Sequence, residues 1–210
     1  MKMPAQALIR VFASSAEVVR AARRRLTNRL LVATLGGAGS NVFVAEPRLW
    51  HPRSSIFLGS DVFFGVGSYV SLGSSHLHIG DGVLFGSDVM IIGGDHNYLA
   101  LGQRMWESTS GGTEADIRVD DDVWCGARAI LLKGVRIREG TVVGAGSVVT
   151  RELPPYIVAA GNPCRPRKLR FSDEELAEHL RARGRTQKEA AAIVQERRAA
   201  AGGLPVAHAQ

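Results

Sequence analysis

Residues 119–154 read VDDDVW-CGARAI-LLKGVR-IREGTV-VGAGSV-VTRELP, a run that divides into consecutive groups of six. The first position of every group is apolar, and the fifth is small or β-branched in the first five groups. The same period runs earlier in the chain, where the first positions are Leu58, Phe64, Val70, Ile79, Phe85 and Ile91. A helix repeats every 3.6 residues and a strand every 2.0, so neither explains a period of six. A parallel β-helix does, because six residues make one short strand plus one corner.

The period is interrupted between Ile91 and Val119, which lie 28 positions apart and so out of step with six. The intervening residues 93–118 read GGDHNYLALGQRMWESTSGGTEADIR, and we expect them to leave the coil and return to it. A long excursion from a rigid scaffold is more often functional than decorative. Its chemistry-bearing side chains are Asp95, His96, Tyr98, Trp106, Glu107 and Glu114.

Composition limits the class of protein. A chain of 210 residues with 45% hydrophobic content suits one domain with appendages. The net charge of +6 is concentrated in the arginines of residues 20–25 and in residues 165–170, which favours an anionic partner. Aromatic residues make up only 6% and show no stacking motif, so we do not expect nucleic-acid binding.

The expected compartment is the cytoplasm. No apolar run approaches the length of a membrane span, and charged residues interrupt the N-terminal segment where a signal peptide would need a continuous apolar stretch. Of the two cysteines, Cys125 occupies a first position of the repeat and is expected to be a buried small hydrophobe. A disulfide with Cys164 is not expected.

The chain divides into three parts. Residues 1–55 are expected to form an amphipathic helix, within 8–35, and a lead-in segment. This helix suits packing on the domain or on a neighbouring subunit better than lying on a membrane surface, although the latter stays open. Residues 56–170 form the repeat domain with its excursion at 93–118, and residues 171–210 form a helical extension and tail.

The C-terminal extension carries clear helix signals. Ser172 and Glu175 form a capping box at the start of one helix, and Gly184 is expected to end it before a second, alanine-rich helix over residues 187–200. The last ten residues are expected to fray.

Residues 124–169, with VGAGSVVT followed by AAGNPCRPRK, resemble the hexapeptide-repeat acyltransferases. The similarity covers about residues 56–170 and is to the galactoside, maltose and xenobiotic O-acetyltransferase branch, in particular the enzymes of polysaccharide biosynthesis. The resemblance implies an all-β repeat fold, a left-handed parallel β-helix, here with flanking N- and C-terminal α-helices. The handedness comes from the resemblance alone, because strand crossovers are normally right-handed. It also implies a homotrimer that binds acetyl-CoA between the coils of two subunits.

His96 matches the position of the family's catalytic histidine at the start of the excursion, seventeen residues after Ile79 in ungapped spacing. A loop histidine on its own is usually a solvated side chain, so the hypothesis depends on the resemblance. A neutral imidazole can take the proton of a sugar hydroxyl as it attacks a thioester. The second ring nitrogen needs an acceptor, and Asp95, Glu107 or a backbone carbonyl are the alternatives.

The resemblance also implies the residues that bind acetyl-CoA. Trp124 and Gly126 match the aromatic residue and glycine that border the cofactor groove, although Trp124 is equally suited to packing on a neighbouring subunit. Ala145 matches the small residue facing the pantetheine arm, whereas Arg151 replaces the family's lysine. The full set is Trp124, Gly126, Ala145, Thr150, Arg151, Arg165 and Lys168.

Two departures qualify the resemblance. Galactoside-type members carry an asparagine and an aspartate that contact the acceptor sugar, where this chain has Val66 and Ser74, so a different acceptor is expected. His76 and His78 form the kind of pair that sometimes binds metal. The related γ-class carbonic anhydrases, however, use histidines five residues apart. This chain has no such pair, and we expect no metal.

The sequence therefore predicts an acetyl-CoA-dependent O-acetyltransferase acting on a sugar or glycan precursor by direct transfer, with His96 as general base. The alternatives are a xenobiotic (antibiotic) acetyltransferase and a non-catalytic trimeric β-helix scaffold. The scaffold alternative accounts for neither the histidine at the start of the excursion nor the basic segment after the repeats. The sequence does not identify the acceptor.

Overall fold

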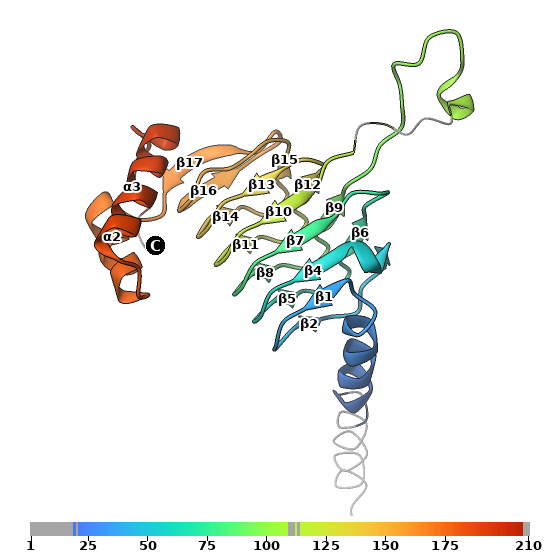
Figure 1. Ribbon diagram of the computed structural model, residues 1–210, viewed down its shortest axis with the longest axis horizontal. Coiled ribbons are helices and arrows are strands. Elements are labelled where there is room, and N and C mark those ends of the chain that lie inside the picture. The colour runs from blue at the N-terminus through green and yellow to red at the C-terminus, as the bar shows by residue number, and fades with distance from the viewer. Residues whose placement is uncertain (1–18, 20, 109–111, 113, 208–210) are drawn as a thin grey trace, which may run out of the picture.

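The computed structural model describes residues 19, 21–108, 112 and 114–207. Their core is a three-sided prism of short strands that coils around one axis (Figure 1). Sheet A contains β1 (Gly37–Ala38), β4 (Ile56–Leu58), β7 (Leu77–Ile79), β10 (Ile117–Val119) and β13 (Arg136–Ile137). Sheet B contains β2 (Phe43–Val44), β5 (Phe63–Phe64), β8 (Leu84–Phe85), β11 (Trp124–Cys125), β14 (Val142–Val143), β16 (Ile157–Ala160) and β17 (Arg165–Leu169). Sheet C contains β3 (Leu49–His51), β6 (Tyr69–Ser71), β9 (Met90–Ile92), β12 (Ile130–Leu132) and β15 (Val148–Val149).

The first position of each six-residue group points into the prism. On sheet B the column Phe64, Phe85, Cys125 and Val143 is at most 1% exposed. The rings of Phe64 and Phe85 stack nearly parallel, with centroids 4.2 Å apart and an interplanar angle of 12°. Neighbouring strands from successive coils pair in parallel. The predicted fold class, a left-handed parallel β-helix with flanking helices, is confirmed.

The corner between sheets B and C is built on a column of glycines, Gly65, Gly86, Gly126 and Gly144. A Cβ added to Gly126 would lie 2.6 Å from the backbone nitrogen of Ala145, in the next coil. The corresponding distances at Gly65 and Gly86 are 2.6 and 2.5 Å, again to backbone nitrogen. Glycine is required at these three positions because consecutive coils stack backbone against backbone there.

The coil begins at Gly37, so the lead-in segment before residue 56 is itself a turn of the β-helix. Val44 and Trp50 are buried six residues apart, and Ala38, one period earlier, pairs with Leu58 and is exposed in the first turn. The period is hidden because extra residues at the corner between sheets C and A delay the next inward position to Leu58. The longer interruptions before Ile79 and before Val119 fall at the same corner. All the departures from the period of six therefore occur at the corner between sheets C and A.

The N-terminal helix closes the first coil. Residues 21–32 are helical, and the part of the predicted helix within residues 8–18 and at residue 20 lies outside the described residues. The Asn28 side-chain amide donates to Val42 O at 2.8 Å, while its oxygen accepts from Val44 N at 2.8 Å. Leu31 is buried, and Arg24 pairs with Glu46 at 3.0 Å. No helix among the described residues is long and apolar enough to cross a membrane.

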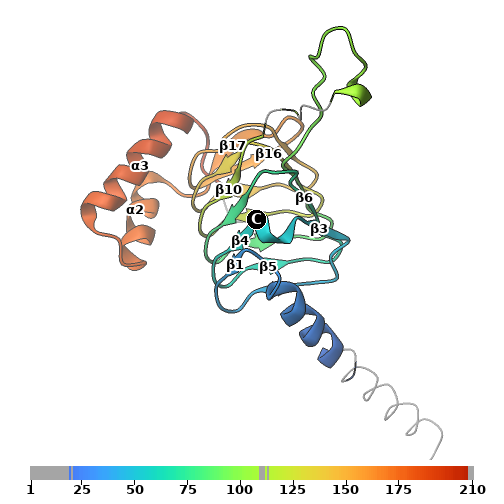
Figure 2. The same ribbon diagram turned by 45° about the vertical axis from the view of Figure 1, so that its right-hand side comes forward.

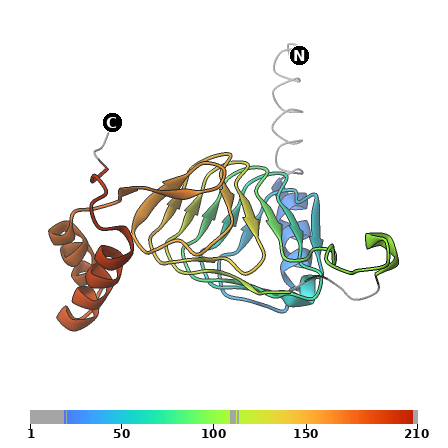
Figure 3. The ribbon, with the colours of Figure 1, turned by 90° about the horizontal axis from the view of Figure 1, so that it is seen from above.

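The other end of the coil carries the helical extension. β17 folds back antiparallel onto β16, and α2 (Asp173–Ala182) and α3 (Gln187–Ala201) follow, at the end away from the excursion (Figures 2 and 3). The predicted capping box of Ser172 is present, and Gly184 lies at φ +86° between the helices. Residues 201–207 are not frayed as expected, because Leu169 N donates to Pro205 O at 2.9 Å and Ala207 N to Leu169 O at 2.7 Å.

Candidate functional site

His96 lies where the excursion leaves the coil, after β9 and at the corner between sheets C and A (Figure 1). Its side chain is exposed. Within the described residues, no hydrogen bond or ion pair to its imidazole ring is present. The excursion beyond it contains one short 3-10 helix, η2 (Met105–Glu107), and extends away from the prism. The imidazole is therefore accessible to a second molecule.

The two carboxylates offered by the sequence as partners of His96 bind elsewhere. Asp95 forms an ion pair with Lys133, which follows β12 in the next coil at the same corner. Glu107 accepts from the backbone N–H and the guanidinium of Arg104, at 3.0 and 2.7 Å. Those two hydrogen bonds, the backbone one first, hold the pKa of Glu107 below its usual range. The Asp95–Lys133 pair fixes the base of the excursion to the coil. Sequence reasoning missed Lys133, whose signal is its place two positions after the inward Leu131 of the repeat.

The corner between sheets B and C presents a narrow backbone surface. Gly126 is buried against Ala145, and Ala145 itself is exposed. Trp124 projects outward from β11 with 53% of its surface exposed. A small side chain at the corner leaves the backbone approachable, and an exposed indole beside it gives an apolar wall.

The basic segment after the repeats divides into two kinds of side chain. Arg170 is structural, because it donates to Asp122 and to Gly140 O, both at 2.9 Å. Arg165 donates to Cys164 O at 2.8 Å, and Lys168 is exposed opposite Val158. The side chains of this second kind, Arg165, Arg167 and Lys168, have no ion pair with any described residue, and neither has Arg151 at the end of the repeats. Cations without carboxylate partners are available to a phosphate or pyrophosphate.

The predicted residues fall on two separate parts of the prism. Thr150 and Arg151 follow β15, so they share the corner between sheets C and A with His96. Trp124 lies on the outer face of sheet B, which is the side opposite that corner. Ala145 and Thr150 are five positions apart, which corresponds to at most about 16 Å of extended chain. Within one chain, His96 and Trp124 therefore lie on different sides of the prism.

A cavity of about 490 Å³ lies elsewhere, between sheet A and α3. Its lining includes Arg118, Arg136 and Glu196, and none of the predicted site residues. Arg136 is neutralised by Asp120, to which it donates three hydrogen bonds of 3.0–3.2 Å. The residues predicted to catalyse the transfer or to bind acetyl-CoA therefore do not line this cavity.

The histidine pair lies on the same outer face of sheet A. The rings of His76 and His78 have centroids 6.2 Å apart, and His78 stacks on Phe57 at 5.1 Å. Partial burial, and secondarily the charge of Arg118, lower the pKa of His78. The His76 ring contacts Asp116 at 3.3 Å. Across the described residues, no group of three or more His, Cys, Asp or Glu side chains is arranged to hold a metal ion.

Both cysteines are buried and free. Burial raises the pKa of the Cys125 thiol, as it does that of Cys164. A thiol kept protonated inside the prism is a poor nucleophile. The site accordingly offers a histidine as its reactive group.

Comparison with known proteins places the chain among transferases built on this fold. The family model for the hexapeptide repeat of succinyl-transferase matches residues 116–151. The galactoside O-acetyltransferase of Lactococcus lactis subsp. lactis is 32% identical over 148 residues, which are 67% of either chain. A chloramphenicol acetyltransferase of Morganella morganii is 40% identical over 62 residues, only 30% of either chain.

Among solved structures, a hexapeptide-repeat-containing acetyltransferase of Vibrio cholerae in complex with acetyl-coenzyme A matches with a TM-score of 0.58. It is 26% identical, and the match covers 67% of this chain and 74% of that one.

Proposed function

The chain belongs to the hexapeptide-repeat acyltransferase family and is an acetyltransferase that uses acetyl-CoA, and we propose that it transfers the acetyl group to a hydroxyl of a sugar or glycan precursor. The observation that carries this proposal is His96, an exposed imidazole at the point where a long excursion leaves a rigid coil. The relatives named galactoside O-acetyltransferase support a carbohydrate acceptor.

In the proposed reaction His96 is the general base of a direct transfer. Its neutral imidazole takes the proton from the acceptor hydroxyl as the oxygen attacks the thioester carbonyl carbon. The resulting tetrahedral intermediate collapses with cleavage of the carbon–sulfur bond, and the imidazolium returns the proton to the departing thiolate. The buried thiols of Cys125 and Cys164 argue against an acyl-cysteine intermediate.

The proposed acetyl-CoA site joins the two parts of the prism. Trp124, Gly126 and Ala145 would border the pantetheine arm, where the exposed backbone at the glycine corner supports the assignment. Thr150 and Arg151 would lie near the adenine and phosphates. Arg165 and Lys168 would contact the 3′-phosphate, which is consistent with their having no carboxylate partner within the described part of the chain.

The proposed assembly is a homotrimer. His96 and Trp124 lie on opposite sides of one prism, so a site containing both needs residues from two copies. Two exposed apolar surfaces support an assembly. One is the outward row on sheet B, which is paired strand to strand and consists of Phe43, Phe63, Leu84 and Trp124. The other is the excursion, where Leu101 and Trp106 are 96% and 95% exposed.

The acceptor is proposed to differ from a simple galactoside. Val66, which stands where galactoside-type members carry a sugar-contacting residue, is 51% exposed and has no hydrogen-bonding side chain. An acceptor from polysaccharide biosynthesis fits this difference, and the cytoplasm, where both cysteines would stay reduced, is the proposed compartment. The second candidate is antibiotic acetylation, favoured by the chloramphenicol acetyltransferase match.

Thiol release from acetyl-CoA, measured against a panel of sugars, sugar nucleotides and chloramphenicol, tests the activity. Turnover with a carbohydrate hydroxyl is expected, and turnover with chloramphenicol alone would favour the second candidate. The absence of thiol release with every acceptor, in a protein shown to bind acetyl-CoA, would favour the scaffold alternative. Light scattering tests the assembly, since a particle of one 22.5 kDa chain at micromolar concentration would contradict the trimer.

A further inference from the structure

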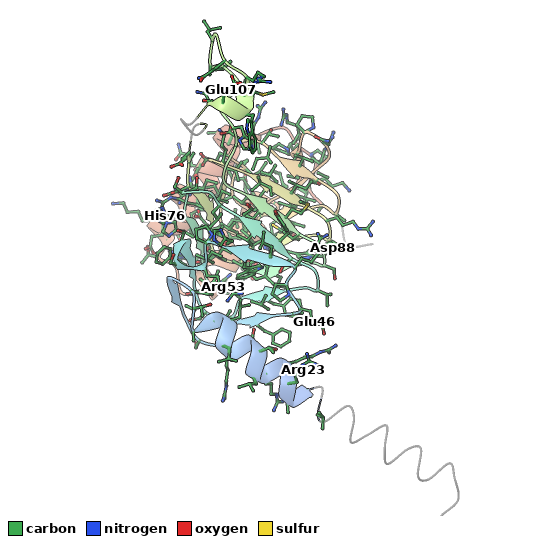
Figure 4. The ribbon with its side chains drawn as sticks, turned by 90° about the vertical axis from the view of Figure 1, so that its right-hand side faces the viewer. Arg23, Glu46, Arg53, His76, Asp88 and Glu107 are labelled. Carbon is green, nitrogen blue, oxygen red and sulfur yellow. The ribbon has the colours of Figure 1, made fainter. Side chains whose placement is uncertain are left out.

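The N-terminal helix has one face committed to the coil. Asn28 occupies the backbone groups of residues 42 and 44, Leu31 is buried, and Arg24 pairs with Glu46. Figure 4 shows the helix, with Arg23 on it, beyond the end of the prism. The orientation of the helix about its own axis is therefore set by named contacts, and so is the identity of the face turned away from the protein.

The opposite face carries an unpartnered apolar stripe. Val19, Leu26 and Leu30 are 66%, 59% and 61% exposed. At 3.6 residues per turn, positions 19, 26 and 30 fall on one line of the helix, while Asn28 lies about 160–200° away from Leu26 and Leu30. Three large aliphatic side chains thus point directly away from the surface on which the helix is anchored.

Arginines border this stripe on both sides. Helical spacing places Arg23 on one flank and Arg29 and Arg25 on the other. None of the three forms an ion pair with a described residue. The sequence has no Asp or Glu between Glu17 and Glu46, so the charge of this segment is uncompensated locally. The outward half of the helix is therefore a short apolar strip between two cationic margins.

We propose that this face of the helix binds the surface of an anionic lipid bilayer. An amphipathic helix lying in the interface buries its aliphatic stripe at the headgroup boundary, while arginines on its flanks extend toward lipid phosphates. Charge decides between occupants: a second copy of the same helix would bring arginines against arginines, whereas an anionic surface complements them. The inference concerns a surface apart from the proposed transfer site and does not depend on it.

Such binding would give the molecule an orientation. The first coil would face the bilayer, and α2 and α3 would lie at the end of the coil away from the helix (Figure 3).

Co-sedimentation of the full chain with phosphatidylcholine vesicles, with and without phosphatidylglycerol, tests the proposal. We expect binding only to the vesicles containing phosphatidylglycerol, and weaker binding as salt is raised. The double substitution Leu26→Gln and Leu30→Gln should weaken binding at least about tenfold, because the apolar stripe is lost. Arg23→Gln, Arg25→Gln and Arg29→Gln should each weaken it about fivefold.

The matched control is Leu99→Gln with Leu101→Gln, which removes from the excursion two leucines that are more exposed than Leu26 and Leu30, and it should leave vesicle binding unchanged. All these side chains are exposed, so melting temperatures should agree among the variants. Wild-type binding to neutral and anionic vesicles alike would overturn the proposal. So would a Leu26/Leu30 variant that binds vesicles normally but has a lower mass in light scattering, because the stripe would then be a contact between subunits.

Discussion

Two corners of the prism differ in how much variation they allow. At the corner between sheets B and C every connection keeps the same length, and a Cβ on Gly65, Gly86 or Gly126 would collide with the next coil. At the corner between sheets C and A the connections range from the short turn after β12 to the whole excursion between β9 and β10. Both corners occur in every complete turn of the coil, so the tolerance for extra residues depends on which corner of the turn they occupy.

The two corners differ in what they present: one presents a rigid backbone surface, and the other presents reactive side chains. Tight stacking at the glycine corner leaves a regular backbone surface, which suits an extended ligand. At the corner between sheets C and A the connections can vary in length, so the chain can carry reactive side chains outward without disturbing the core. His96 and the Asp95–Lys133 pair lie at the free corner, while Gly126 and Ala145 lie at the fixed one.

The largest effect is expected at the free corner. His96→Ala should lower kcat by about 10²–10⁴, the usual contribution of a positioned general base, while acetyl-CoA binding stays unchanged. Steady-state kinetics and calorimetric binding measure the two quantities.

His78→Ala provides the control, since His78 lies on sheet A away from the proposed site and its loss should leave kcat near the wild-type value. If His96→Ala keeps full kcat, the general base must be sought among Asp95, Glu107 and Glu114.

The fixed corner should respond in stability. Gly126→Ala should cost about 3 kcal/mol in the free energy of unfolding, because its Cβ meets backbone, which yields less readily than a side chain. Gly102→Ala is the matched variant in the excursion, where φ is +76° but no atom lies within 4 Å of the added Cβ. It should cost only about 1 kcal/mol. Equal costs in denaturant unfolding would remove the proposed contrast between the corners.

A smaller effect tests the cofactor side of the comparison. Arg165→Ala and Lys168→Ala should each raise the KM for acetyl-CoA about tenfold, equivalent to about 1.4 kcal/mol, with little change in kcat. The variants should also discriminate less against a substrate lacking the 3′-phosphate. Lys188→Ala, which removes an exposed cation from α3, should change neither quantity. Unchanged discrimination in the first two variants would place the 3′-phosphate elsewhere.

The coil was predictable because its period is set by local geometry. Each inward residue from Val119 to Val149 is at most 2% exposed, as the spacing of six requires. The coil before residue 56 was missed because only two inward positions follow Ala38 before extra residues displace the next one to Leu58. Too few repeats of the six-residue period occur there for the sequence to identify this turn of the coil.

For the candidate site, the sequence predicted which residues belong to it but not the contacts that these residues make. The sequence places His96 at the start of the excursion, but it does not show that Asp95 pairs with Lys133, 38 residues further along the chain. The pairing of residues 205–207 with Leu169 was missed for the same reason, since it joins segments distant in sequence. Contacts of this kind depend on where the coil brings the backbone.

A parallel coil is in principle an open-ended template, since each turn offers a complete set of donors and acceptors to the next. In sheet B both openings are taken within the chain: Asn28 occupies the free groups of β2, and β17 is laid in the opposite direction across the last turn. The reversed strand changes the hydrogen-bond pattern presented at that edge. Growth of fibres by end-to-end stacking of molecules, the hazard of any exposed strand edge, is thereby checked at both ends of this sheet.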